Sequence, residues 1–416
     1  MSAATRDSLA VCVVCDLATT LPPLAEGERA ECPRCGHTLH ERQHTDSQRQ
    51  VAWSVAALVM LALSLFFPFL ALQAQGSEHA IIVADAALAL LEYDYAALAL
   101  LVIATIVLMP AVYLGLMLFL HAARLAGRRP PGAAFMARLL TSMQPWMMSD
   151  VFIVGVLVAM VKILTLADVA FGVAFVAFCL FTLLLLKTIV DFDPSELWDS
   201  LAGRWPAPVH LKPGRAARAQ GVQVCKGCEA LYAVSRPNCP RCGRRRPAPD
   251  HLRLQATWAL LATAAILYIP AMAYPVMRII DFGQPSEQTI VGGVVYLVEV
   301  GSWPIALVIF VASVVVPIAK VMALSWLAWK ARLAQAGRGR ERMKLYKFTE
   351  FIGRWSMIDV FVVALLVALV QAGQVMAVYP GPGIVAFGAV VIITMIAAMT
   401  FEPQLLWRDS HGQREP

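Results

Sequence analysis

Eight long apolar blocks are the feature that most constrains how this chain folds. Each holds about twenty residues, the length a helix needs to cross a hydrocarbon layer about 30 Å thick. The blocks lie at about 51–72, 97–120, 147–167, 171–191, 257–277, 303–329, 357–373 and 383–401. With 59% hydrophobic and only 15% charged residues, the chain cannot cover itself with polar surface. We therefore predict an all-α polytopic membrane protein with eight transmembrane helices and exclude a soluble enzyme, a collagen-like fibre and a disordered chain.

The chain contains an internal duplication. The segment WMMSDVFIVGVLVAMV, which begins at Trp146, matches WSMIDVFVVALLVALV, which begins at Trp355. FDPSELW from Phe192 matches FEPQLLW from Phe401 at the same separation of 209 residues. Each half holds four blocks, an even number, so the two halves run through the membrane in the same direction. We expect two tandem four-helix domains.

Two polar stretches carry eight of the nine cysteines, arranged in four C-x-x-C pairs. One stretch precedes the first apolar block, and the other separates the two halves. Each four-helix domain is therefore preceded by a small cysteine-bearing head. We predict a first head at 1–50, a four-span domain at 51–200, a second head at 201–255 and a second four-span domain at 256–416.

Each head combines one C-x-x-C pair with one C-P-R-C-G sequence. Such tight turns direct two sulfurs at one ion, and the glycine accepts a left-handed backbone conformation. Two turns of this kind make a closed, structural four-sulfur site in a head too small to hold a core without it. We predict zinc-ribbon-like or rubredoxin-like heads with zinc, although the spacing does not exclude iron. The predicted ligands are Cys12, Cys15, Cys32, Cys35, Cys225, Cys228, Cys239 and Cys242.

Several neighbouring residues have a less specific interpretation. His37, His40 and His44 follow the first cysteine set and are alternative ligands. The second head has no equivalent histidines, so we interpret all three as solvated polar residues. Cys179 lies inside an apolar block and is interpreted as a packing residue. The basic run 241–246 is interpreted as a solvated or lipid-facing patch, so no nucleic acid is predicted as a partner.

Basic residues indicate the orientation of the chain. The loops at 121–145 and 331–356 carry four and seven Lys or Arg residues, whereas 73–96 and 163–170 carry none. The positive-inside rule places the basic loops, both heads and both termini in the cytoplasm. Residues 1–50 show no secretory signal, and a reducing cytoplasm keeps cysteines available as metal ligands.

Ionisable residues within the apolar blocks are candidates for a transport pathway, because the membrane interior excludes charges that have no function. Lys187 and Asp191 are one helical turn apart and can pair. They also lie near a span end, where snorkelling to the interface is the alternative interpretation. Lys320 lies deeper and follows Pro317, where we predict a break in the helix.

Three further candidates complete this set. Asp150 and Asp359 occupy equivalent positions at the start of apolar blocks, where the helix dipole also favours an acidic residue. Lys162 lies within the third block. The pathway candidates are therefore Lys187, Asp191, Lys162, Lys320, Asp150 and Asp359.

The two halves differ in these charges. Lys187 and Asp191 of the first half correspond to Ile396 and Thr400 of the second half. We therefore expect the first half to be better equipped for a polar pathway. Replacing Lys187 or Asp191 is expected to abolish function, whereas Ile396 and Thr400 should tolerate exchange.

Motifs for known catalytic chemistry are absent from the sequence. It contains no G-x-x-x-x-G-K-[ST] phosphate loop, no G-x-S-x-G elbow and no H-E-x-x-H helix. We therefore predict that the protein is not an enzyme. Any uphill transport would need a proton gradient, a separate ATPase chain or a lipid gradient.

The combined motifs resemble the paraquat-inducible protein A family of PqiA/LetA-like inner-membrane proteins. The resemblance rests on the duplicated heads, on W-x-M-x-D-V-F at Trp146 and Trp355, and on F-[DE]-P-x-x-L-W at Phe192 and Phe401. It implies an inner-membrane protein beside a periplasmic partner with MCE domains, which together move phospholipid between two membranes. One departure is the spacing within the heads, sixteen residues between the pairs in the first and ten in the second.

Three functions follow from these patterns. The first is the inner-membrane component of an MCE-type lipid transport system. The second is a stand-alone small-molecule exporter, which would act without a partner. The third is a membrane redox protein that uses the C-x-x-C pairs, which would contain iron and change colour reversibly.

Overall fold

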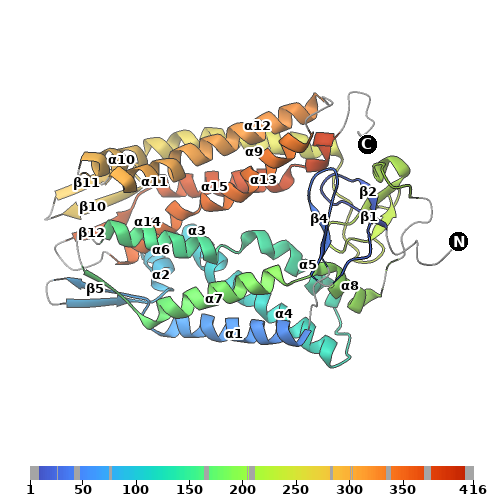
Figure 1. The fold of residues 1–416 in the computed structure, drawn as a ribbon. Coiled ribbons are helices and arrows are strands. Elements are labelled where there is room, and N and C mark those ends of the chain that lie inside the picture. Colours follow the sequence, from blue (N-terminus) through green and yellow to red (C-terminus); the bar gives the residue numbers. More distant parts are fainter. Residues whose placement is uncertain are drawn as a thin grey trace.

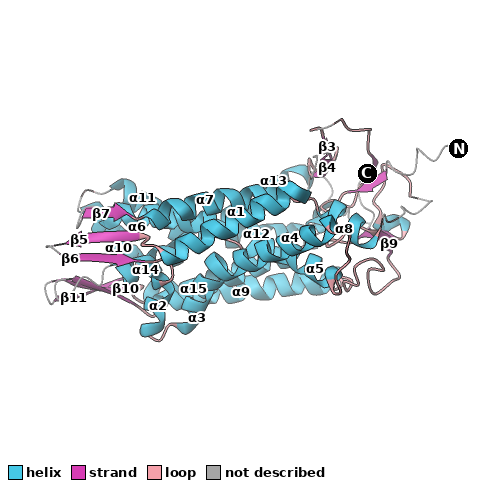
Figure 2. Ribbon diagram, turned by 90° about the horizontal axis from the view of Figure 1, so that it is seen from below, coloured by secondary structure: helices cyan, strands magenta, loops and turns pink. Residues whose placement is uncertain are grey.

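The computed structural model describes most of the chain. The described residues are 9–25, 27–41, 47–74, 77–163, 168–203, 205, 211–281, 284–299, 301, 303–333, 339–369 and 376–407. Figure 1 shows a long body of helices with the cysteine-bearing residues at one end, here called the head end. Two small sheets lie at the opposite end, here called the strand end, and Figure 2 shows the same arrangement from below.

Eight helical segments in the described chain are long and apolar enough to cross a membrane, which confirms the predicted number of spans. The spans are Ser47–Phe66, Ala96–Leu125, Ala133–Met160, Val173–Val190, Asp250–Ala273, Ala306–Arg332, Gly339–Ala368 and Gly383–Thr400. Large apolar side chains face outward along them, as expected where lipid replaces water as the surrounding solvent. The protein is therefore a polytopic membrane protein.

The helices of the first half come from residues 47–202. They are α1 Ser47–Phe66, α2 Asp85–Glu92, α3 Ala96–Ile103, α4 Met109–Leu125, α5 Ala133–Met143, α6 Ser149–Ile163, α7 Val173–Val190 and α8 Pro194–Ala202. Buried residues of α1 recur every three or four positions, so one stripe of this helix faces α4 and α7.

The second half repeats this order. Its helices are α9 Asp250–Ala273, α10 Ile290–Glu299, α11 Trp303–Phe310, α12 Val316–Arg332, α13 Gly339–Trp355, α14 Ile358–Leu369 and α15 Gly383–Thr400. A short 3-10 helix at Pro403–Trp407 takes the place of α8. The duplication seen in the sequence is therefore a duplication of structure.

The second span of each half contains a π-helical turn. The turns lie at Ala104–Leu108 and Val311–Val315, just before Pro110 and Pro317. A proline ring lacks the N–H and clashes with the preceding turn of an α-helix, and a wider turn relieves that clash. The predicted break at Pro317 is thus a local widening within one continuous span.

A three-stranded antiparallel sheet closes the strand end of each half. In the first half β5 Leu70–Ala74 pairs with β6 Ser77–Ile81 and β7 Asp168–Phe171. In the second half β10 Met277–Asp281 pairs with β11 Gln284–Gln288 and β12 Met376–Pro380. The sequence did not predict these strands, because the predicted first and fifth spans ran on into β5 and β10.

The heads contain the remaining strands. The first head has the hairpins β1 Leu9–Val11 with β2 Ala18–Thr20 and β3 Arg29–Glu31 with β4 Thr38–Glu41. The second head has the hairpin β8 Val222–Val224 with β9 Leu231–Ala233. Short hairpins of this kind bury too little apolar surface to be stable alone, as expected for heads held by a metal.

The two halves share one hydrophobic core. Helices α6 and α14 pack together at the centre, and the rings of Phe152 and Phe361 meet edge to face at 5.8 Å. A Cβ atom on Gly155 would lie 3.3 Å from the Cβ atom of Phe361, so the helices approach closely. Helix α2 of the first half also packs against α14 of the second. The halves therefore form one packed unit, a question that the sequence left open.

Candidate functional site

The structure brings the eight predicted ligands together in two buried quartets. One consists of Cys12, Cys15, Cys32 and Cys35, and within each quartet all sulfur atoms lie within 4.8 Å of one another. The other consists of Cys225, Cys228, Cys239 and Cys242. All nine cysteines are free of disulfides, and Cys179 lies apart on α7.

Sulfur spacing in the quartets fits a tetrahedral ion. The Sγ atoms of Cys12 and Cys35 are 3.5 Å apart, and those of Cys228 and Cys239 are 3.6 Å apart. A tetrahedron with metal–sulfur bonds of about 2.3 Å has edges of about 3.8 Å. Each quartet could therefore hold one metal ion with all four positions filled by protein.

Each of the four cysteine turns is followed by a residue in the left-handed backbone conformation. Gly36 and Gly243 follow the C-P-R-C sequences with φ of 64° and 71°, the left-handed conformation that the sequence predicted for them. Asp16 and Glu229 take the same place after the first pair of each head, at φ of 66° and 55°. The four turns therefore share one geometry despite the different spacing within the two heads.

Interactions between the sulfurs shift the thiol pKa values of each quartet in both directions. Hydrogen bonding from Cys12 raises the pKa of the Cys15 thiol, and hydrogen bonding from Cys225 raises the pKa of the Cys228 thiol. Hydrogen bonding from Cys12 lowers the pKa of the Cys32 thiol, and hydrogen bonding from Cys225 lowers the pKa of the Cys239 thiol. Burial lowers the pKa of His37, which favours the neutral imidazole. His37 and His40 lie outside the quartet, and His44 lies outside the described residues.

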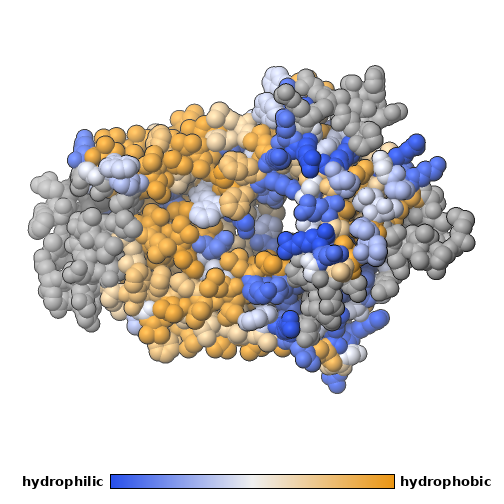
Figure 3. All heavy atoms as spheres, viewed as in Figure 1, coloured by the Kyte–Doolittle hydropathy of each residue, from blue (hydrophilic) through white to orange (hydrophobic). Residues whose placement is uncertain are grey.

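A cavity of about 470 Å³ lies between the two halves, toward the head end. Figure 3 shows hydrophilic residues gathered in the hollow of an otherwise hydrophobic belt. One wall comes from the segment before α6, from α6 and from α7, and the other comes from α12, α13 and α15. The cavity is therefore a property of the whole molecule, since neither half encloses it alone.

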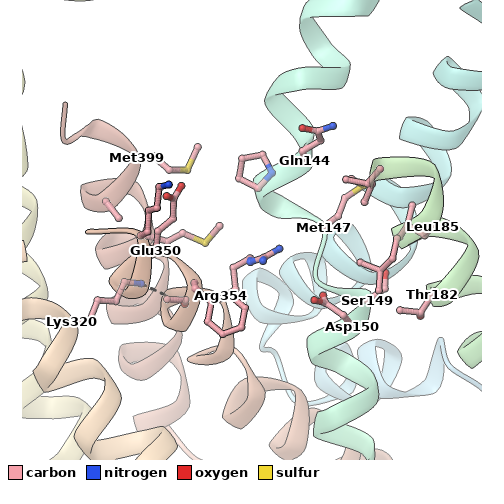
Figure 4. A pocket seen from close by; sticks show the side chains of 18 residues that line it. Gln144, Met147, Ser149, Asp150, Thr182, Leu185, Lys320, Glu350, Arg354 and Met399 are labelled. Atoms are coloured by element: carbon pink, nitrogen blue, oxygen red, sulfur yellow. Dashed lines mark hydrogen bonds between the residues drawn. The ribbon is translucent and has the colours of Figure 1, made fainter. Parts of the chain in front are cut away.

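The two walls of the cavity differ in charge. Figure 4 shows Asp150 on the first-half wall opposite Lys320, Glu350 and Arg354 on the second-half wall. Lys347 also lines the second-half wall, which thus carries three cations and one anion. Most of the other residues that line the cavity are apolar, and they include Leu185, Leu186, Ile189, Met147, Met395 and Met399.

Lys320 is the most deeply buried of these cations. Only 3% of the residue is exposed, and its Nζ donates to the backbone oxygen of Gly353 at 3.5 Å. A Cβ atom at position 353 would lie 2.9 Å from that Nζ, so the glycine makes room for the ammonium group. Lys320, a pathway candidate from the sequence, therefore lies at the surface of the cavity.

The other pathway candidates lie in different places. Lys187 and Asp191 form an ion pair of 2.8 Å on α7, with 53% and 22% of their side chains exposed, and neither lines the cavity. Asp359 is half-buried at the start of α14 outside the cavity. The side chain of Lys162, on α6, lies outside the described residues. Of the five candidates whose side chains the structure describes, Asp150 and Lys320 line the cavity and the other three do not.

Sequence reasoning missed the residues that α13 contributes. The segment 331–356 was treated as a basic loop because its charges lower its average hydropathy, yet most of it is the amphipathic helix α13. A helical spacing of three and four residues places Lys347, Glu350 and Arg354 on one face. That spacing is the feature of the sequence from which this charged helix face could have been predicted.

Comparisons with known proteins agree with this arrangement. The family described as paraquat-inducible protein A matches residues 47–202 and 254–411, once for each half. The Escherichia coli (strain K12) intermembrane transport protein PqiA is 40% identical over 399 residues, 95% of each chain. No solved structure matches the chain.

Two more distant relatives cover nearly the same length. A probable intermembrane transport protein of Haemophilus influenzae is 29% identical over 408 residues, 95% of each chain. The lipophilic envelope-spanning tunnel protein A of Escherichia coli (strain K12) is 28% identical over 402 residues, 96% of this chain and 91% of the relative. The family matches both halves, and the relative that is 40% identical covers 95% of the chain. This protein therefore belongs to the paraquat-inducible protein A family.

Proposed function

We propose that this protein is the inner-membrane component of a lipid transport system and passes phospholipid to a periplasmic MCE-domain partner. The observation that carries the proposal is the charged cavity between the two halves. Two relatives are named as an intermembrane transport protein and an envelope-spanning tunnel protein, which supports transport instead of catalysis.

The cavity has the chemistry that a phospholipid requires. Its volume of about 470 Å³ lies within the usual range of ligand sites. Lys320 and Arg354 would bind a phosphate through charge-assisted hydrogen bonds. The leucine and methionine side chains would contact the beginning of the acyl chains, while the remainder of the chains stays in the bilayer.

The proposal includes an orientation. Both heads lie at one end of the molecule, and the basic helix α13 extends toward the same end. The positive-inside rule places that end in the cytoplasm. The strand end would then face the periplasm, where the sheets and α10 would meet the MCE-domain partner. Each head would bind one zinc ion at a structural site. The proposed domain limits are 1–50, 51–200, 201–255 and 256–416, as expected from the sequence.

Bound lipid tests the site. Protein purified with Lys320→Met is expected to retain about tenfold less phospholipid than wild type, because a charged hydrogen bond contributes about 1.5–3 kcal/mol. The matched control is Lys330→Met on the same helix, which does not line the cavity. Mass spectrometry of extracted lipid gives the ratio. Equal lipid in the two variants would refute the cavity as the lipid site.

Partner dependence distinguishes lipid transfer from stand-alone export. Co-purification with an MCE-domain protein, and lipid transfer only in its presence, is the expected result. Activity without the partner would favour the small-molecule exporter.

Metal analysis tests the redox alternative. The result expected from the proposed function is two zinc ions per chain and a colourless protein. Iron and a reversible colour change would favour the redox protein instead.

A further inference from the structure

Each half ends in a short segment that carries a tryptophan. We call Phe192–Trp198 the first exit and Phe401–Trp407 the second exit, after their shared F-[DE]-P-x-x-L-W sequence. All seven residues of the second exit are buried. What buries the two exits shows how the heads are attached to the membrane body.

The second head docks on the first exit. The indole Nε1 of Trp198 donates to the backbone oxygen of Gly227, in the C-x-x-C turn, at 2.8 Å. Arg241 of the C-P-R-C turn pairs with Asp199 and donates to the backbone oxygen of Gly203 at 2.8 Å. This head follows the first exit directly in the sequence, so its docking there closes only a short loop.

The first head docks on the second exit, at the far end of the chain. The amide Nε2 of Gln404 donates to the backbone oxygen of Val13, in the C-x-x-C turn, at 2.9 Å. The guanidinium of Arg34, in the C-P-R-C turn, lies 4.5 Å above the ring of Trp407. The cysteines of this head share a hydrophobic core with Leu327 of α12 and with α13 and the second exit.

An equivalent arginine takes part in both docking arrangements. Arg34 and Arg241 occupy the same position in their turns, and each also donates to a carbonyl of its own head, that of Cys15 at 3.4 Å and that of Cys228 at 3.1 Å. The repeating structural unit is therefore four spans, an exit and the head that docks on it. In the sequence, by contrast, each head precedes its spans.

We propose that the first head serves as the head of the second half, and that its metal site holds the cationic wall of the cavity in place. The first head is connected to the cavity through Trp407 and α13. Trp407 packs against the start of α13, where a Cβ atom on Gly339 would lie 2.6 Å from the indole ring. The same helix presents Lys347 and Arg354 to the cavity.

The heads also contact one another and share the second exit. The carboxylate of Asp16 accepts a hydrogen bond from the backbone N–H of Arg218 at 3.0 Å. Lys226 of the second head pairs with Glu402 of the second exit at 2.8 Å. The second head therefore makes hydrogen bonds or ion pairs with both exits, whereas the hydrogen bond from an exit to the first head comes from the second exit. The first head thus supplies the sharper test.

Amide hydrogen exchange of the full chain in lipid nanodiscs tests the proposal, with metal content measured in parallel. The variant Cys32→Ser with Cys35→Ser removes ligands of the first site, and Cys239→Ser with Cys242→Ser is its matched control. The first variant is expected to raise exchange about tenfold in 339–355 and 401–407 and to leave 133–143 and 194–202 unchanged. The control is expected to raise exchange in 133–143 and 194–202.

A second pair of variants keeps both metal sites intact, in case the cysteine variants do not fold. Gln404→Leu is expected to raise exchange severalfold in the first head, and Trp198→Phe in the second head, because each removes one hydrogen bond worth about 1 kcal/mol. If loss of the first metal site loosened 194–202 and left 339–355 protected, the proposal would be wrong. It would also be wrong if Gln404→Leu changed only the second head.

Discussion

Glu402 is completely buried where the second head, the second exit and α9 meet. Lys226 and Arg253 both pair with its carboxylate. Removing one partner of a buried ion pair leaves an uncompensated charge, which costs far more than losing a surface pair. At the scale of single residues, the attachment of the heads therefore depends strongly on this one side chain.

Glu402→Gln is expected to lower the free energy of unfolding by about 1.5–3 kcal/mol, because Arg253, with 13% of its side chain exposed, loses a charged hydrogen bond, while the more exposed Lys226 contributes less. Denaturation of the purified protein in detergent measures the change. The control is Glu287→Gln, whose pair with Arg278 is more than half exposed on both sides and should contribute less than about 1 kcal/mol. Similar losses for both variants would contradict the assigned role.

Lys187→Met and Asp191→Asn are expected to abolish function in a complementation assay while changing stability by less than about 1 kcal/mol, because about half of the Lys187 side chain is exposed and solvent screens the pair. Exchange of the equivalent residues Ile396 and Thr400 should be tolerated. The measurement is growth of a deletion strain that carries each variant. Equal tolerance at all four positions would remove this pair from the pathway.

Residues were predictable wherever their type and spacing determine the chemistry. The eight cysteines fall into this class, since two C-x-x-C turns suffice to define a four-sulfur site. Arg354 and Glu350 do not, because an isolated charge pattern in an amphipathic helix fits a solvated face equally well. The packing of α13 against α12, α15 and the second exit turns that face toward the cavity.

At the scale of elements, two equivalent glycines determine how the fourth span of each half begins. A Cβ atom on Gly172 would lie 1.9 Å from the backbone oxygen of Pro68, and one on Gly381 would lie 2.2 Å from that of Pro275. These contacts join the start of the last span to the end of the first. No side chain fits between them without moving the backbone of the strand end.

Gly172→Ala and Gly381→Ala are each expected to destabilise the protein by at least about 1–3 kcal/mol, the usual cost of overpacking a closed contact. Gly115→Ala is the control, because Gly115 lies in α4 with open space around its Cα. There alanine should be neutral or stabilising by about 0.5–1 kcal/mol. Thermal denaturation of the three variants supplies the comparison, and a stabilised Gly172→Ala would show that the contact is not closed.

The number of spans could be predicted from the sequence, but the residues at which the spans end could not. Apolar residues continue beyond Phe66 into β5, and hydropathy alone does not separate a buried strand from the end of a helix. Pro68 and Pro275 mark the true ends, since the residue before a proline avoids the helical conformation. The same prolines supply the carbonyls that approach Gly172 and Gly381.

At the scale of the whole molecule, the sequence order hides the structural unit. Motifs predict two heads and two halves, yet nothing in one sequence indicates which head docks on which exit. That choice depends on contacts between residues almost 400 positions apart, such as Gln404 with Val13. The shared core of α6 and α14 was equally unpredictable, because lipid and protein favour the same apolar side chains.

A circular permutant tests the structural unit directly. Joining residue 416 to residue 1 and opening the chain between 41 and 47 gives the order four spans, exit, head, four spans, exit, head. We expect this protein to fold with wild-type metal content and thermal stability, because the docking surfaces are unchanged. Size-exclusion chromatography and metal analysis check the result. A permutant that inserts in the membrane but loses one metal would show that the first head must precede the first span.

The docking of the first head on the second exit also has a consequence in time. The head is the first of these parts to leave the ribosome, and its binding surface is the last. At the usual ~5–20 residues per second, the roughly 360 residues between them take about 20–70 s to synthesise. During that interval the first head can contact the second head but not the second exit. The first head can therefore dock on the second exit only after every span has been made. A prematurely terminated chain would expose an apolar head surface to the proteases and chaperones that remove incomplete proteins.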